Sequence, residues 1–77
     1  MIWILRSTNS EVTDFYLETV ASALEKAGFA TMTVSAEKVK ECVAAHARSE
    51  DWFLSSNVME ACRIFLWGAR NVILWCQ

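Results

Sequence analysis

The stretch that decides the fold of this chain is its opening run, Met1-Ile-Trp-Ile-Leu5, together with the polar run Arg6–Ser10 that follows. A short, nearly continuous apolar run of this kind is typical of a strand buried on both faces. Such strands lie inside parallel sheets that helices cover on both sides. Ligands of these sheets bind beyond the carboxyl ends of the strands, so Arg6–Ser10 lies where a site is expected.

The composition is rich in core residues and poor in surface residues. Of the 77 residues, 55% are hydrophobic, with four Trp and four Phe, and the net charge is −2. A chain of this length buries a modest fraction of its surface, and small self-sufficient domains devote more of their sequence to solvated surface. We therefore expect one partial α/β domain over residues 1–77, an amino-terminal fragment of a larger protein.

Charge, hydropathy and cysteine spacing argue against several classes of partner. The seven basic residues are scattered along the chain, which disfavours nucleic acid, and no apolar run reaches the length of a membrane span. Cys42, Cys62 and Cys76 lack CxxC spacing, which favours free thiols in a reducing compartment. We expect a cytoplasmic protein without a nucleic-acid partner, a transmembrane segment, a metal ion or a cofactor.

Apolar spacing along the rest of the chain predicts three more strands and three helices. The first helix ends at Gly28, the second begins after Ser35 as its cap, and the third begins after Asn57. Asn57 and Glu60 form the N-x-x-E pattern of a capping box. The expected strands are 1–5, 29–35, 52–55 and 71–76, and the expected helices are 11–27, 36–48 and 58–69.

Each helix is expected to turn one apolar stripe toward the sheet. The stripes are Val12, Phe15, Tyr16, Val20, Leu24 and Ala27 in the first helix, Val39, Cys42, Val43 and His46 in the second, and Val58, Ala61, Cys62, Phe65, Leu66 and Ala69 in the third. Ile64 and Trp67 are then left on the far side of the third helix. His46 is interpreted as a helix-end histidine and not as a ligand or general base, because no second histidine accompanies it.

The alternation of strands and helices predicts an α/β fold in β-α-β-α-β-α-β order. We expect a three-layer parallel sheet with strand order 3-2-1-4, which is half of a Rossmann-like domain. The fourth strand, Val72-Ile-Leu-Trp75, is far too apolar for an edge strand. We therefore expect the isolated chain to form a homodimer or larger homo-oligomer, because Leu74, Trp75, Ile64 and Trp67 need cover.

Small polar residues follow every expected strand and make a rim at one edge of the sheet. They are Arg6–Ser10, Ser35, Ser55–Asn57 and Gln77. Such a rim suits hydroxyl-rich or phosphorylated ligands, and the same residues can equally be helix caps alone. No glycine follows the first strand, so the run is neither a dinucleotide-binding fingerprint nor a P-loop. No catalytic residue is identified from the sequence.

The closing stretch Asn71-Val72-Ile73-Leu74-Trp75-Cys76-Gln77 resembles the N-V-I-x-W-x-Q segment of bacterial glycosyltransferases of the GT-B type, family-4-like group. The order of elements before it is similar to the amino-terminal Rossmann-like half of that family. The resemblance implies a half-domain of an enzyme that transfers a sugar from a nucleotide-sugar to an acceptor. By the same resemblance, substrate contacts fall at the inter-domain cleft, on Ser7, Thr8, Asn9, Ser10 and Gln77.

The resemblance has one departure, and besides the alternative given below it leaves open a third and weakest interpretation, an intact small-ligand or phosphate-binding enzyme. Many family members have glycines after the first strand, where this chain has Arg-Ser-Thr-Asn-Ser. The family binds the donor nucleotide in its second domain, so this chain alone is expected to be inactive, with nucleotide-sugar and acceptor bound only by the full-length protein. The alternative is a small self-associating α/β interaction module without catalysis.

Overall fold

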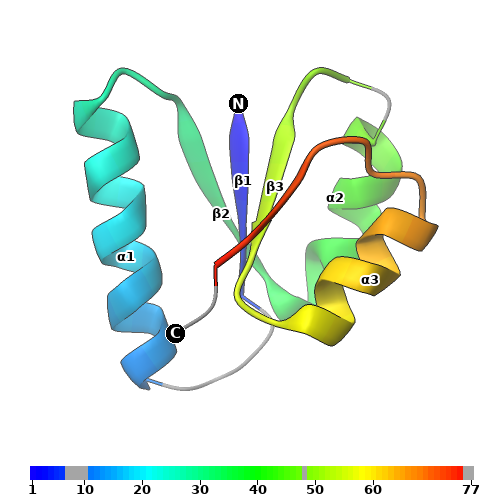
Figure 1. Cartoon of the computed structure of the whole chain (residues 1–77), viewed down its shortest axis with the longest axis horizontal. Coiled ribbons are helices and arrows are strands. Elements are labelled where there is room, and N and C mark those ends of the chain that lie inside the picture. Colours follow the sequence, from blue (N-terminus) through cyan, green and yellow to red (C-terminus); the bar gives the residue numbers. More distant parts are fainter. Residues whose placement is uncertain (7–10, 48, 76–77) are drawn as a thin grey trace.

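The computed structural model describes residues 1–6, 11–47 and 49–75. Strands and helices alternate along the chain as predicted, with a short 3-10 turn, η1, before the second helix (Figure 1). The strands are β1 (Ile2–Arg6), β2 (Thr31–Ser35), β3 (Trp52–Ser55) and β4 (Val72–Leu74), and the helices are α1 (Glu11–Lys26), η1 (Ala36–Lys38), α2 (Val39–His46) and α3 (Val58–Leu66). The α/β class is confirmed.

The four strands are all parallel and lie in the order β2-β1-β3-β4. The predicted order 3-2-1-4 is therefore wrong, because β3 lies beside β1 and leaves β2 at the edge. The physical reason lies in β3, whose consecutive residues Phe53 and Leu54 are both buried, one in the core on each face of the sheet. An edge strand is less well covered, so β3 belongs in the interior.

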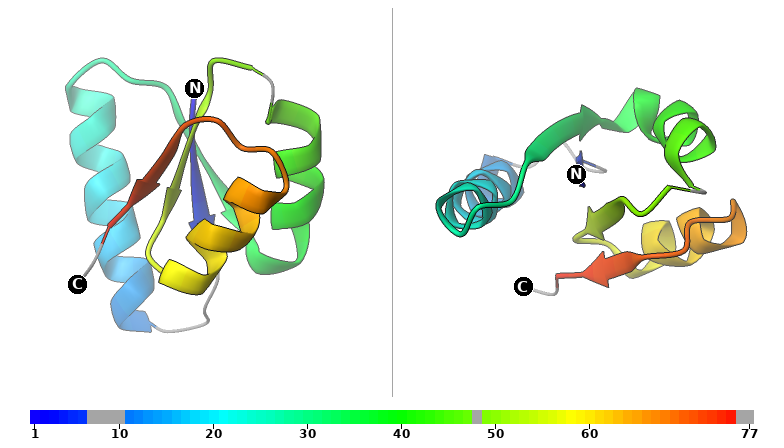
Figure 2. Two further views of the ribbon diagram at one scale, coloured as in Figure 1. Left: turned by 45° about the vertical axis from the view of Figure 1, so that its right-hand side comes forward. Right: turned by 90° about the horizontal axis from the view of Figure 1, so that it is seen from above.

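One helix covers one face of the sheet, and two helices cover the other. Viewed from above, α1 lies on one side and α2 and α3 lie on the opposite side (Figure 2). Because side chains alternate along a strand, Ile4 of β1 points into the α1-side core and Leu5 into the other. Strand β1 is therefore buried on both faces, which confirms the interpretation of the opening run.

Helix α1 turns part of the predicted stripe, Val20 and Leu24, toward the sheet and the aromatic part away from it. Phe15 and Tyr16 are exposed and contact each other edge to face, with ring centroids 6.0 Å apart. Leu17 is buried instead and packs with partly buried Val20, Ala21 and Leu24. These four positions have the i, i+3, i+4, i+7 spacing of a complete helical stripe, which the two aromatic residues do not share. The side chain of Val12 lies outside the described part of the chain.

Helix α3 also presents the face opposite to the predicted one. Ile64, expected on the far side, is 0% exposed, whereas Phe65 and Leu66 of the predicted stripe are 66% and 82% exposed. The apolar spacing of this helix is marked, and it is the less apolar side, with Glu60 hydrogen-bonded to Ser55, that faces the sheet. The inward face carries Glu60, which is 8% exposed and lies one turn before Ile64.

Two glycines end helices in the left-handed conformation, Gly28 where the sequence predicts and Gly68 before the predicted bound of residue 69. Gly28 after α1 has a φ of 97°, and Gly68 after α3 has a φ of 101°. Beyond Gly68, the amide of Ala69 donates to the carbonyl of Ile64 at 3.0 Å, the six-to-one bond of a Schellman motif. The positive φ favours glycine because a Cβ atom would be strained there. These turns direct the chain from each helix into the next strand.

Candidate functional site

The strand order reverses between β1 and β3, so the carboxyl ends of these two strands flank the position where doubly wound sheets bind ligands. Arg6 ends β1 and Ser55 ends β3, and Leu5 pairs with Ser55 in the register of the two strands. The predicted binding residues all lie outside the described part of the chain; they are Ser7, Thr8, Asn9, Ser10 and Gln77. The described part of this edge therefore begins with Arg6 and Ser55.

A polar network joins the end of β3 to the start of α3. The buried hydroxyl of Ser55 donates to Oε1 of Glu60 at 2.6 Å and accepts from the backbone N–H of Asn57 at 3.2 Å. Oδ1 of Asn57 accepts from the backbone N–H of Glu60 at 3.0 Å. Asn57 is thus the predicted helix cap, but the predicted capping box is only half formed, because Ser55 takes the place of Glu60 at the Asn57 amide.

Arg6 lines the hollows around the end of β1. One hollow of about 460 Å³ lies between Arg6 and the turn formed by Ser35 and Glu37. Another, of about 240 Å³, lies on the α1 side, between Arg6 and Glu18. The predicted cap Ser35 does precede η1, but its side chain makes no capping hydrogen bond. The guanidinium brings N–H donors to this corner.

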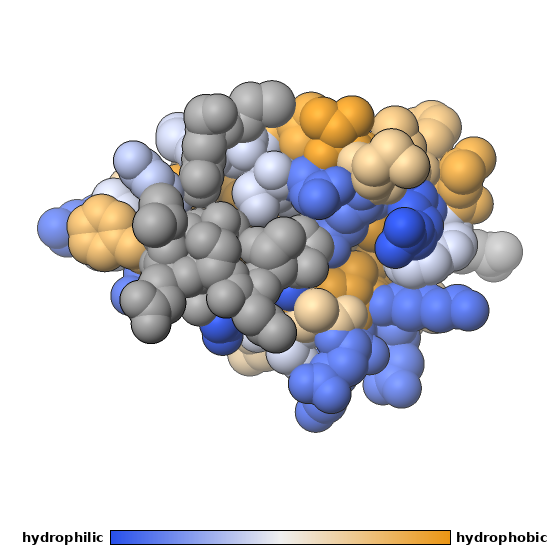
Figure 3. All heavy atoms as spheres, turned by 90° about the horizontal axis from the view of Figure 1, so that it is seen from below, coloured by the Kyte–Doolittle hydropathy of each residue, from blue (hydrophilic) through white to orange (hydrophobic). Residues whose placement is uncertain are grey.

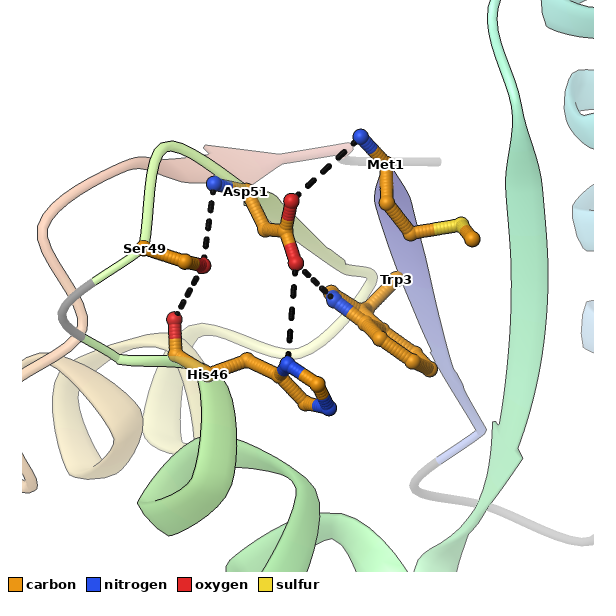
Figure 4. A network of polar contacts seen from close by, with 5 residues as sticks. All are labelled: Met1, Trp3, His46, Ser49 and Asp51. Atoms are coloured by element: carbon orange, nitrogen blue, oxygen red, sulfur yellow. Dashed lines mark hydrogen bonds and ion pairs between the residues drawn. The ribbon is translucent and has the colours of Figure 1, made fainter.

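A second polar network lies at the opposite end of the strands, around Asp51 (Figure 4). Oδ2 of Asp51 accepts from the indole N–H of Trp3 at 2.9 Å and lies 3.7 Å from Nδ1 of His46. Oδ1 lies 3.4 Å from the amino group of Met1. Ser49 donates to the carbonyl of His46 at 2.6 Å and accepts from the N–H of Asp51 at 3.2 Å. The network joins the end of α2 to the start of β1.

The hydrogen bond from Trp3 is the main cause that lowers the pKa of Asp51, and the amino terminus lowers it further, although partial burial opposes both. Asp51 is therefore ionised at neutral pH. His46 is the last residue of α2, which confirms its interpretation as a helix-end histidine, and it stacks on Trp3 with ring centroids 4.4 Å apart. Trp3 and Asp51 are 48 residues apart, so no local pattern indicated their contact.

Cys42 and Cys62 are free thiols, as predicted, and Cys76 lies outside the described residues. Burial raises the pKa of Cys42, and the negative charge of Asp51 raises it further. Among the described residues, no group of three or more His, Cys, Asp or Glu side chains could hold a metal ion. In the same part of the chain, no helix has the length and hydrophobicity needed to cross a membrane.

Exposed apolar residues, here together called the α3–β4 face, lie on the outer side of α3 and along the edge strand β4. Its exposed residues are Val58, Met59, Phe65, Leu66, Leu74 and Trp75. Between α3 and β4 it is hollowed by about 470 Å³, and the lining includes Cys62, Phe65 and Val72. Seen from the carboxyl ends of the strands, hydrophobic side chains gather at the upper right, on the α3 side (Figure 3).

The carboxyl edge offers a guanidinium, a hydroxyl and an amide, which are groups that bind hydroxyl and phosphate oxygens. Among the described residues of this edge, Glu60 is the one carboxylate close to Ser55, and it already accepts the Ser55 hydroxyl proton. The arrangement supports binding of a polar ligand. Comparisons with protein-family models, with curated proteins and with solved structures give no match to this chain.

Proposed function

We propose that the chain supplies the acceptor-facing half of the active site of a glycosyltransferase. The observation that carries this proposal is the closing segment, residues 71–77, with its resemblance to a strand of such enzymes. The polar carboxyl ends of β1 and β3 support it, because they lie side by side where the strand order reverses. Hydroxyl and guanidinium groups there match the hydrogen-bonding groups of a sugar acceptor.

The proposal includes a requirement for further protein. Sugar transfer needs donor, acceptor and developing charge to be held together, and the described half-site supplies few of the necessary groups. A donor-binding domain that packs on the α3–β4 face would also bury its exposed apolar residues. The strand order 2-1-3-4 differs from the expected 3-2-1-4, so support comes from the closing segment and the polar edge and not from topology.

The test is the size and activity of the protein as cells make it. An antibody raised against residues 1–77 would be used to isolate the native protein, which we expect to be much longer than 77 residues. The isolated protein should release a nucleoside diphosphate from one of a panel of UDP-, GDP- and ADP-sugars, and only when an acceptor is added. A native protein of 77 residues, or a longer one that cleaves none of these donors, would refute the proposal.

The α3–β4 face favours a second candidate, a self-associating module without catalysis. A second copy could pair its β4 with this β4 about a two-fold axis, which would extend the sheet and bury both apolar faces. Sedimentation velocity should then show a dimer for the wild type and a monomer for Leu66→Lys and Trp75→Lys. The control is Met32→Lys, an exposed apolar residue of the opposite edge strand, which should remain dimeric. A monomeric wild type at high concentration would exclude this candidate.

A further inference from the structure

A groove of about 630 Å³ lies between the edge strand β2 and helix α2, on the face of the sheet opposite α1. Trp3, Met32 and Val34 give it an apolar floor, because alternation along β1 and β2 points all three to this face. Small-molecule sites commonly have volumes of about 300 to 1,000 Å³ and mainly apolar walls. The groove therefore has the size and lining of a site for a small ligand.

Two stacked rings form a rigid wall at one end of this groove. Trp3 and His46 both line it, and their rings lie 4.4 Å apart at an interplanar angle of 27°. Oδ2 of Asp51 contacts both residues: it accepts the indole N–H of Trp3 at 2.9 Å and lies 3.7 Å from Nδ1 of His46 (Figure 4). Nε2 of His46 lies on the side of the ring away from Asp51. Rings fixed before binding lose little entropy when a flat ligand packs against them.

The other end of the groove carries basic side chains. Lys38 and Arg6 line it with an ammonium and a guanidinium, and Glu41 adds one carboxylate to the lining. The hydroxyl of Ser35 lies at the same end, and it makes no capping bond. A guanidinium and an ammonium are the usual partners of carboxylate and phosphate groups. The ammonium of Lys38 can therefore bind one anionic group of a ligand in the groove.

We propose that the groove between β2 and α2 binds a small ligand with a flat apolar body and one anionic group, a carboxylate or a phosphate. The body packs on Trp3 and Met32, and the anionic group lies at the end near Arg6 and Lys38. The site shares Arg6 with the carboxyl edge described above, but its apolar floor lies under α2 and serves no step of sugar transfer. An extended peptide added along the edge of β2 is the competing occupant, and it would need no anionic group.

The proposal is tested by nuclear magnetic resonance titration of the ¹⁵N-labelled chain with two matched probes, 2-naphthoate and the uncharged 2-naphthamide. Naphthoate should shift the indole N–H signal of Trp3 and the amide signal of Val34, and naphthamide should bind about fivefold more weakly. Equal binding of the two probes would overturn the charge argument. Shifts confined to Phe65 and Leu66 on the α3–β4 face would overturn the location.

Two lysines of neighbouring position provide a matched pair of variants. Lys38 lines the groove, whereas Nζ of Lys40 lies 5.9 Å from the centre of the Trp67 ring, toward α3. Lys38→Gln should weaken naphthoate about fivefold and leave naphthamide unchanged, and Lys40→Gln should change neither affinity. Equal effects of the two substitutions on naphthoate, or no effect of Lys38→Gln, would show that the groove does not bind the anionic group.

Discussion

Helices α2 and α3 lie on the same face of the sheet, and yet their sequences predict their packing with opposite success. Helix α2 buries Val39 and Val43 as its apolar stripe predicts, and hydrophilic side chains fill the lower right of the view from the strand ends, on its side (Figure 3). Helix α3 buries Glu60 and Ile64 and leaves Leu66 outside. The apolar stripe of α3 is therefore turned away from the sheet, although it is the more pronounced of the two stripes.

Each of the two helices is also fixed at one end by a polar network. Asp51 joins the end of α2 to β1 through contacts with His46 and Trp3. Ser55 and Glu60 join the start of α3 to β3. In α3 such a network can decide which side faces the sheet against the apolar pattern, because a buried carboxylate without a partner is very costly. The comparison between α2 and α3 can therefore be tested one contact at a time.

The largest effect is expected for the inward residue of α3. Ile64→Ala should lower the free energy of unfolding by about 2 to 4 kcal/mol, because it leaves a cavity under a fully buried side chain. Leu66→Ala, two residues later and 82% exposed, should change it by less than about 0.5 kcal/mol. Urea unfolding at several protein concentrations separates folding from association. The reverse ranking would mean that α3 packs as its apolar pattern alone indicated.

A smaller loss is expected from the network that orients α3. Ser55→Ala removes the hydroxyl that donates to Glu60 and should lower the free energy of unfolding by about 1 to 3 kcal/mol. The matched control is Ser56→Ala, at the next position and outside the network. Urea unfolding measures both variants. Equal stability of the two variants would show that the network does not determine the orientation of α3.

The comparison also shows which parts of the fold the sequence predicts. The positions and types of the strands and helices follow from local periodicity, and so does the buried stripe of α2. The strand order does not follow from local periodicity, because right-handed crossovers allow β3 to lie on either side of the pair formed by β1 and β2. The choice depends on the burial of Phe53 and Leu54 on both faces, which is a property of the assembled sheet.

The candidate sites divide in the same way. The carboxyl edge was predictable, since parallel strands end there and polar residues follow each strand. The groove under α2 was not predictable from the sequence, because Trp3 cannot be distinguished there from a core residue. Its contacts with His46 and Asp51 also join positions far apart in the chain. Local spacing indicates where a strand ends, and it does not indicate which helix lies above it.

The network at the end of α2 should make stability depend on pH. The pKa of Asp51 is lower in the folded chain than its ordinary value of about 3.9, so the folded state is favoured by the ionised form. This stabilisation is present above the unfolded pKa and is lost as the pH falls through the folded pKa. Urea midpoints measured from pH 7 downward should fall below about pH 5, and less steeply in Asp51→Asn.

The exposed neighbour Glu50 provides the control for this measurement, because Glu50→Gln removes a carboxylate next to Asp51 without breaking the network. The acid dependence of Glu50→Gln should match that of the wild type. An Asp51→Asn variant with the wild-type acid dependence would show that Asp51 does not link α2 to β1 in solution.

The smallest effect is expected in the rate at which iodoacetamide modifies the cysteine of each helix. Cys42 of α2 is half-buried with a raised pKa, whereas Cys62 of α3 is exposed on the outer side. In chains that keep only one of them, with Cys76→Ser, iodoacetamide at pH 8 should modify Cys62 about tenfold faster than Cys42, because the thiolate is the reactive form. The two rates should converge in urea. Equal rates in the folded chain would contradict the orientation of α3, and a Cys62 rate that falls with protein concentration would show that a second copy covers the α3–β4 face.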